Sequence, residues 1–398
     1  MSHIPREKLP LTAFSDLRTA ELTPQFQGSF EYTVDNTELN TNTVVNTGTV
    51  TQGSAMAVVG TGTTTGSTAL FQSKRHAKYR AGLGGVQRFT TLHTTPVAGT
   101  TQLAGIVDEV GSSEDFKNGL VVGYNGATFN FNRYANDVMV SVPLASWDDP
   151  LDGSGPSGQT IDHTKLNIWF IQFGYLGALG PMLWFVGQDN VPYRVHMMPI
   201  CGTLAEPISH NPNYHYTIFA DNGATTSNMV AKCGSYAYFI EGKTKYFELH
   251  QPQFSTGKQT KTGVTTETNI VTIRNKSTYA SKTNFIDILL ELASVGIEAG
   301  ANNNLGEVRL VRNATIGGSP SYTDVNTSDS VVDYDVAGTT VTGGKTLAII
   351  ELAGKNDSDN LNLIPYDIII APGETVTFAG ASAASAEFRV TPLWKELF

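Results

Sequence analysis

Cysteine is scarce in this chain. Only two of the 398 residues are cysteine, Cys201 and Cys233. Two cysteines this far apart exclude a disulfide scaffold and the ligand spacing of a zinc site. We expect both to be small buried side chains, and a single bridge between neighbouring strands is the alternative.

Long apolar runs are also missing. The longest candidate, Ile168 to Val186, is interrupted by Gln172, Gly174 and Pro181, so it is too short and too polar for a membrane helix. The first residues have no apolar stretch of the kind that signal peptides carry. We therefore expect a protein made in a cytoplasm, without a membrane segment.

Charge is low as well. Charged residues make up 16% of the chain and the net charge is −10, against about 25% charged residues in ordinary soluble domains. An acidic chain with few cations argues against a nucleic-acid surface. The one basic run, 74–80, is not followed by Gly-Lys-Ser/Thr, so it is interpreted as a strand with outward cations rather than a phosphate loop.

What the chain has instead is threonine, asparagine and 39 glycines, which suit pleated strands and tight turns. Residues 52–248 hold short alternating strands. Gly119–Tyr124 and Ala127–Phe131 flank Asn125-Gly126, which predicts a hairpin with a type I′ turn. Trp169 and Trp184 lie within strand patterns and are expected in the core.

Residues 267–398 contain a second series of short strands, the pattern of a jelly-roll. The stretch Phe285–Leu292 is interpreted as one of these strands rather than a helix. A polar segment, 249–266, is expected to be a linker. The predicted fold is therefore all-β, with two antiparallel β-sandwich domains. The first is concanavalin-like or a jelly-roll, and the second is a jelly-roll.

Residues 1–51 are poor in apolar side chains and predict an extended N-terminal arm. The arm is either a plain tail or a docking segment that orders on a partner, because ordering must be offset by a contact surface. Its docking residues would be the few large apolar ones. These are Phe14, Leu17, Phe26 and Phe30.

No pattern in the chain indicates catalysis. Gly153-Ser154-Gly155 has no strand-to-helix context for a nucleophilic serine, and none of the eight histidines has metal-ligand spacing. We expect no catalytic residue, no metal site and no cofactor. The most acidic loop, 147–155, is interpreted as a solvated loop, with a calcium or magnesium site or a subunit contact as alternatives. The residues singled out for glycan or interface contact are Trp147, Asp148, Asp149 and Asp152.

Several segments resemble structural proteins of tailed bacteriophages and large DNA viruses, and the resemblance covers most of 54–398. It implies a virion component, such as a head fibre, a capsid decoration, or a tail or baseplate fibre. The segments that carry it are Ser73–Thr90, Val121–Phe129, Leu151–Gly158, Phe173–Gly177, Ile273–Tyr279, Lys282–Ile286, Ala371–Glu374 and Trp394–Phe398.

The expected function is therefore that of a virion structural protein, made in the host cytoplasm and located in the virion. It would self-associate as a homo-oligomer, for which a trimer would suit a fibre, and dock on other virion proteins. The alternative is a virion module that binds a host-surface glycan, and the third hypothesis is a hydrolase of such glycans. We expect no nucleic-acid or membrane partner.

Overall fold

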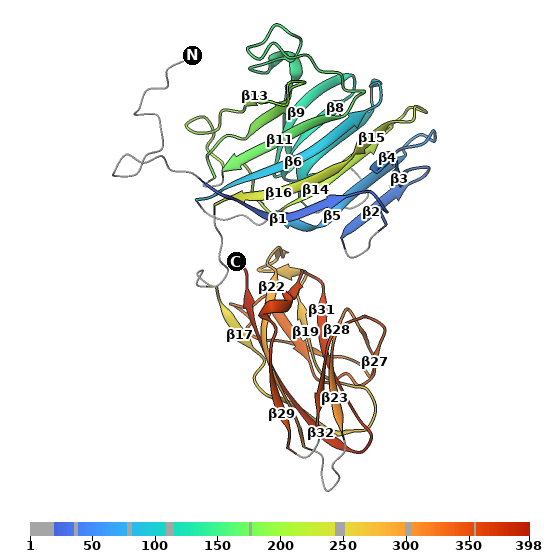
Figure 1. Ribbon diagram of the computed structural model, residues 1–398, viewed down its shortest axis with the longest axis vertical. Helices are drawn as coiled ribbons and strands as arrows, with labels where there is room; N and C mark the ends of the chain where they lie inside the picture. The colour runs from blue at the N-terminus through green and yellow to red at the C-terminus, as the bar shows by residue number, and fades with distance from the viewer. Residues whose placement is uncertain are drawn as a thin grey trace, which may run out of the picture. The chain divides into compact units, whose positions relative to one another are not determined.

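The computed structural model describes residues 20–35, 39–77, 82–108, 115–174, 177–242, 251–298, 305–353 and 356–398. The chain divides into two compact units, Met1–Thr244 and Lys245–Phe398. Each is built of antiparallel sheets (Figure 1), which confirms the predicted all-β class with two sandwiches. Among the described residues, no helix is long and apolar enough to cross a membrane. The described residues include two short 3₁₀ turns, η2 (Leu144–Ser146) and η3 (Ile364–Tyr366).

The first unit packs a nine-stranded sheet on a seven-stranded sheet. In the nine-stranded sheet, β6 lies at the centre and pairs with β11 on one side and with β16 and β15 on the other. Its strands are β13 (Pro192–Met197), β12 (Met182–Val186), β11 (Asn167–Gly174), β6 (Gly84–His93), β16 (Ser235–Glu241), β1 (Leu22–Ser29), β15 (Val230–Cys233), β4 (Met56–Gly60) and β3 (Thr49–Gly53).

The seven-stranded sheet runs in the order β10-β9-β8-β7-β14-β5-β2. Its central strands are buried on both faces. The strands are β10 (Val138–Pro143), β9 (Thr128–Ala135), β8 (Gly119–Asn125), β7 (Thr101–Val107), β14 (Tyr214–Asp221), β5 (Thr68–Ala77) and β2 (Asn40–Val45).

The predicted hairpin is β8 and β9, and its turn differs by one residue from the expectation. Asn125 pairs with Thr128, so the two turn residues are Gly126 and Ala127. Gly126 has φ +63° while Ala127 keeps a negative φ. This is the pattern of a type II′ turn, with glycine first, rather than the predicted type I′ turn.

The main core of the first unit lies between its two sheets and is rich in aromatic side chains. Trp169 is fully buried, as expected, and stacks on Phe129 at a centroid distance of 5.8 Å. Tyr216 stacks on Tyr236 from the opposite sheet at 4.2 Å. Large rings bring much of the apolar area that a sandwich buries.

A smaller core covers the outer face of the seven-stranded sheet. Leu103, Val121 and Phe219 point to this face and are buried. Phe116 packs edge-on against Phe219 and against Tyr134, at centroid distances of 5.5 and 5.4 Å. This part of the face is therefore closed and offers no open cleft to a ligand.

The expected N-terminal arm does not extend to residue 51, because strands of the first unit begin at Leu22. β1 pairs with β16 along its length, and β2 and β3 pair with β5 and β4. Phe26 and Phe30 are buried in the core, 6% and 3% exposed. Their assignment as docking residues is wrong, since they already pack against Tyr238 and Phe71. Phe14 and Leu17 lie outside the described residues.

The second unit is a sandwich of two six-stranded sheets. The segment predicted as a linker, 249–266, is instead partly sheet, because β17 and β18 pair with β32. Phe285–Leu292 is a strand at its C-terminal end, where β22 begins at Ile288. The first sheet contains β17 (Gln253–Ser255), β18 (Gln259–Val264), β32 (Ala386–Glu396), β22 (Ile288–Glu298), β29 (Ser358–Asn362) and β30 (Ile369–Ile370).

The other sheet of the second unit runs in the order β25-β26-β19-β31-β23-β28. The core between the two sheets includes Trp394 and Phe378, both fully buried. The strands of this sheet, with two short ladders, are β25 (Tyr322–Asp324), β26 (Val332–Asp335), β19 (Thr268–Asn275), β31 (Thr375–Ser382), β23 (Gly306–Arg312), β28 (Lys345–Leu352), β20 (Thr278–Tyr279) with β21 (Lys282–Thr283), and β24 (Thr315–Ile316) with β27 (Val341–Thr342).

Candidate functional site on the outer face of the nine-stranded sheet

The acidic loop that the sequence singled out is folded in on itself. Trp147 is only 5% exposed, and its indole Nε1 donates to the Val142 carbonyl at 2.9 Å. Asp149 is 3% exposed and accepts from the backbone N–H groups of Leu151 and Ser157. Contact of these two side chains with a glycan is therefore corrected to a role in closing the loop.

The other two acidic residues of this loop are exposed, but they also have local partners. Asp152 accepts hydrogen bonds from the Ser154 hydroxyl and from the Ser154 N–H, the latter at 2.8 Å. Both hydrogen bonds, the hydroxyl's first, lower the pKa of the Asp152 carboxyl. Asp148 accepts from the Met197 N–H at 3.1 Å. Within the described part of the chain, no group of three or more histidine, cysteine or acidic side chains is arranged to hold a metal ion.

Three half-buried aromatic side chains of the first unit lie elsewhere, on the outer face of the nine-stranded sheet. Phe170, Trp184 and Phe239 are half-buried and alternate with core residues on β11, β12 and β16. The register places Phe170 beside both Trp184 and Arg88, and Arg88 also lies beside Ala237. We call Phe170, Trp184, Phe239 and Arg88 the aromatic face. An antiparallel sheet normally turns polar residues to solvent, so this composition indicates a contact surface.

Arg88 is at the centre of the aromatic face. Its guanidinium lies 4.8 Å from the ring centroid of Phe170 and 5.1 Å from that of Phe239. Cation–π contacts of this kind stabilise the guanidinium beside the two rings. Its Nε is buried without a hydrogen-bond partner. A buried donor without a partner is costly to the folded state, and this atom is out of reach of a bound molecule.

A row of hydrogen-bonded polar groups borders the aromatic rings. Trp184 Nε1 donates to Gln172 Oε1 at 3.0 Å, and Gln172 Nε2 donates to Glu241 Oε1 at 2.6 Å. Burial raises the pKa of Glu241, while the bond from Gln172 opposes that rise. These hydrogen bonds hold the indole of Trp184 in one orientation. The site therefore combines apolar ring surfaces with oriented polar groups, which is the make-up of small-molecule sites in general.

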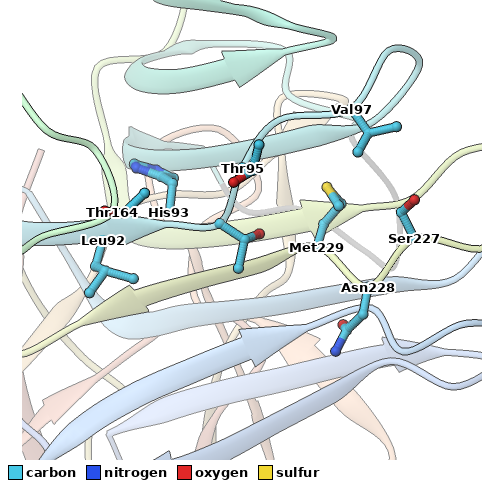
Figure 2. A pocket seen from close by; sticks show the side chains of 9 residues that line it. Leu92, His93, Thr95, Val97, Thr164, Ser227, Asn228 and Met229 are labelled. Atoms are coloured by element: carbon cyan, nitrogen blue, oxygen red, sulfur yellow. The ribbon is translucent and has the colours of Figure 1, made fainter.

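β6, the strand that carries Arg88, leads from the aromatic face to a hollow at the end of the sheet. Leu92 and His93 leave β6 on opposite sides (Figure 2). The hollow has a volume of about 630 Å³ and is lined mainly by hydroxyl, amide and small apolar side chains. Gln102 fixes the adjoining loop by accepting from both N and Oγ1 of Thr94. The lining residues are Leu92, His93, Thr94, Thr95, Val97, Thr164, Ser227, Asn228 and Met229.

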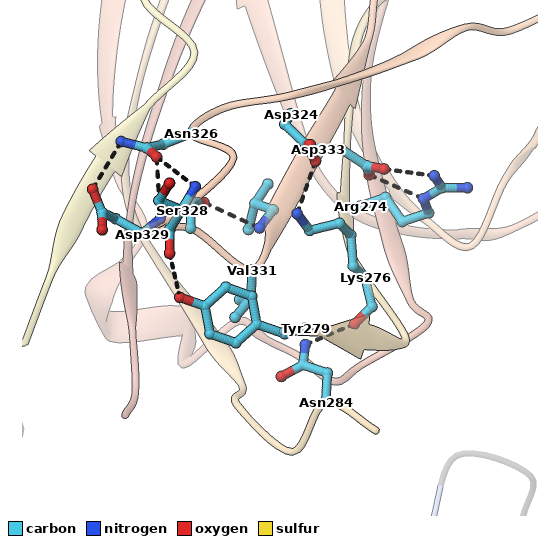
Figure 3. Close-up of polar contacts among 12 residues, drawn as sticks. Arg274, Lys276, Tyr279, Asn284, Asp324, Asn326, Ser328, Asp329, Val331 and Asp333 are labelled. Atoms are coloured by element: carbon cyan, nitrogen blue, oxygen red, sulfur yellow. Dashed lines mark hydrogen bonds and ion pairs between the residues drawn. The ribbon is translucent and has the colours of Figure 1, made fainter. Parts of the chain in front are cut away.

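A second polar cluster, in the second unit, is structural (Figure 3). Arg274 binds Asp333 through two hydrogen bonds of 3.0 and 2.6 Å, and its guanidinium lies 3.7 Å from the ring centroid of Tyr322. Lys276 pairs with Asp324 at 2.8 Å, and the Tyr279 hydroxyl donates to the Ser328 carbonyl. These charges satisfy one another, so the cluster fastens loop 324–331 to β19 and β20.

Sequence reasoning missed the aromatic face because its strands are apolar at successive positions. Ile168, Trp169, Phe170 and Ile171 are all apolar, so a period of two residues could not separate the core side from the solvent side. Trp184, which was expected in the core, is half-buried and points outward. Both cysteines are free, and Cys233 is buried as expected, whereas Cys201 is exposed and differs from the expectation.

Comparison with known proteins assigns the chain to no family. No protein-family profile and no curated protein matches it. Among solved structures, it is similar to a β-1,3-glucanase from Mycobacterium marinum, with 10% identity, a TM-score of 0.38, and coverage of 54% of this chain and 98% of that one.

Two further likenesses are of the same order. A glycosyl hydrolase family protein from Mycobacterium fortuitum shares 12% identity at a TM-score of 0.36, covering 54% of this chain and 99% of that one. A legume lectin-like domain from Entamoeba histolytica shares 9% identity at a TM-score of 0.33, covering 50% of this chain and 89% of that one. Likenesses this distant assign no function to the chain.

Proposed function

We propose that this chain is a glycan-binding protein and that the aromatic face of the first unit is its binding surface. The observation that carries the proposal is the set of half-exposed rings of Phe170, Trp184 and Phe239 around Arg88. A sugar ring has an apolar C–H face and a rim of hydroxyl groups. The aromatic rings can stack on the C–H face of a sugar, and Arg88, Gln172 and Glu241 can form hydrogen bonds with its hydroxyl groups.

We propose that the chain binds glycans without cleaving them. Glycoside hydrolysis needs two carboxyl groups on either side of the scissile bond, about 5 to 9.5 Å apart. The aromatic face carries Glu241, whose Oε1 accepts from Gln172. A second carboxylate is not among the residues that the register places around Arg88.

The test is binding of the full chain to an array of microbial and animal glycans, followed by titration of the best-retained oligosaccharide. Trp184→Ala removes the locked indole and should weaken binding at least about tenfold. Ile168 is 41% exposed on the same face. Ile168→Arg should therefore block the surface without removing a core residue, which keeps the test valid if Trp184→Ala folds poorly.

Tyr32→Ala is the matched control, because Tyr32 is an exposed aromatic residue, 95% exposed, outside the aromatic face. It should bind like the wild type. Retention of affinity by both Trp184→Ala and Ile168→Arg would refute the site. Release of reducing ends from a bound polysaccharide would show an enzyme instead. A change of mass on Ile168→Arg, measured by light scattering, would make the face a self-association surface.

A second proposal concerns the setting. The run of segments that resembles phage and large-virus structural proteins, together with 16% charged residues, supports a virion structural protein that packs closely against other proteins, since few charges need desolvation. In that case the glycan would belong to the host surface. Locating the chain in an electron-microscopy map of the particle tests this. Its absence from purified particles would contradict it.

A further inference from the structure

β10 is an unusual edge strand. It ends the seven-stranded sheet and pairs on one side with β9. Val138, Met139 and Val140 are 61%, 40% and 43% exposed, and the strand contains no charged residue. Native proteins usually protect such an edge with charges, prolines or bulges, because its free backbone groups and apolar side chains can pair with another strand.

Two other edge strands of the first unit, β13 and β1, are protected in these ways. β13 carries proline and arginine, and β1 carries a proline at a bulge. β2 and β3 are made mainly of threonine, asparagine and glutamine. β10 has a proline only at its last position, Pro143, where the strand ends anyway. β10 therefore combines a mainly apolar sequence with the absence of charges and bulges.

The backbone of β10 shows which residues face the free edge. In an antiparallel pair, every second residue turns its N–H and C=O away from the partner strand. Ala135 and Val138 close the two-residue turn Asn136-Asp137 and therefore exchange both of their backbone hydrogen bonds. Val138 and Val140 thus turn their backbone groups toward β9, while Met139 and Ser141 turn theirs to the open edge.

We propose that β10 pairs antiparallel with β10 of a second copy of this chain, around a two-fold axis at Val140. This pairing joins the two seven-stranded sheets into one continuous sheet. It forms a closed dimer, since a two-fold contact uses the same surface on both copies. The proposal is independent of glycan binding, because β10 belongs to the other sheet from the aromatic face.

The sequence of β10 is complementary to itself in this register. Val140 lies opposite Val140, Val138 opposite Val142, and Met139 opposite Ser141, so one face of the new ladder is made of valine pairs. Such pairs stabilise sheets. The charged residue nearest to β10 along the chain, Asp137, lies opposite Pro143. The two Asp137 carboxylates are then about 20 Å apart at 3.4 Å per residue, well beyond the range of unscreened repulsion.

A cysteine at the axis tests the register directly. In a Cys201→Ser background, which removes the exposed native thiol, Val140→Cys should form a covalent dimer under mild oxidation. Directly opposed residues lie within the Cα range of a disulfide. Val44→Cys is the matched control, because Val44 is an exposed valine, 48% exposed, on β2 at the opposite edge of the same sheet. It should stay monomeric on a non-reducing gel.

Sedimentation over a range of concentrations measures the equilibrium. The wild type should be a dimer, and Val140→Lys should raise its dissociation constant at least about tenfold, because two like charges would face each other. Val44→Lys should leave it unchanged. The proposal is overturned if the wild type is monomeric at every concentration. That result is also expected if β10 pairs with a different protein instead of a second copy. A trimer, or equal weakening by Val44→Lys, also overturns it.

Discussion

Two neighbouring histidines, His93 and His163, are largely buried in the first unit. His93 is 1% exposed, both of its ring nitrogens lack a hydrogen-bond partner, and it packs edge-on against Tyr124 and Phe129. His163 lies over Phe129 at a centroid distance of 3.9 Å. Burial lowers the pKa of His93 to about 3 and that of His163 to about 4. Both rings are therefore neutral in the folded protein near pH 7.

These lowered pKa values predict acid sensitivity of the first unit. In the unfolded chain each histidine titrates near 6.5, so the unfolded state binds more protons than the folded state between about pH 6.5 and the folded pKa values. Stability should be complete above about pH 6.5 and fall as the pH drops, by about 2 kcal/mol per histidine at pH 5. Denaturant unfolding between pH 7 and pH 4.5 measures this.

His93→Phe keeps an aromatic ring at this position and removes one titrating group, so the loss of stability toward acid should become less steep. His210→Gln is the control, because the His210 side chain is 40% exposed and its removal should leave the slope unchanged. Equal slopes for the wild type and His93→Phe would contradict the assignment.

At the scale of single elements, β1 is an integral strand of the first unit. Phe26 stacks on Tyr238 of β16 at 5.5 Å and an interplanar angle of 22°. Phe26→Ala should lower the free energy of unfolding by about 3 kcal/mol, the usual cost of truncating a buried aromatic ring. Tyr32→Ala, six residues later in an exposed position, should change it by less than about 0.5 kcal/mol. A stable Phe26→Ala variant would restore the docking-arm hypothesis for this segment.

At the scale of the whole molecule, the two units have separate cores. The cores of the first unit draw on residues up to Ile240, and the core of the second begins at Val264. Calorimetry should therefore resolve two unfolding transitions. Trp394→Ala removes a fully buried side chain of the second unit and should lower one transition by on the order of 10 °C. Phe26→Ala should lower only the other. A common shift of both transitions would contradict independent unfolding.

The strand pattern of the sequence predicted much of this architecture. Alternating apolar residues and a two-residue glycine turn indicated the β8–β9 hairpin, because both features are local. The high content of threonine, asparagine and glycine indicated an all-β chain. The bounds were less accurate at the N-terminus and between the units, because β1, β17 and β18 are short or polar strands whose partners, β16 and β32, lie far away in the sequence.

The sequence by itself determined that Trp147, Trp169 and Trp184 sit among apolar or turn-forming neighbours, but only the tertiary structure decided which of them faces solvent. The register of β11 against β12 turns Trp169 inward and Trp184 outward, although both lie in continuous apolar runs. Trp147 begins the acidic loop and is nonetheless buried against Trp169. The physical reason is that burial depends on what the other sheet brings opposite each side chain, and that is a property of long-range strand pairing rather than of local sequence.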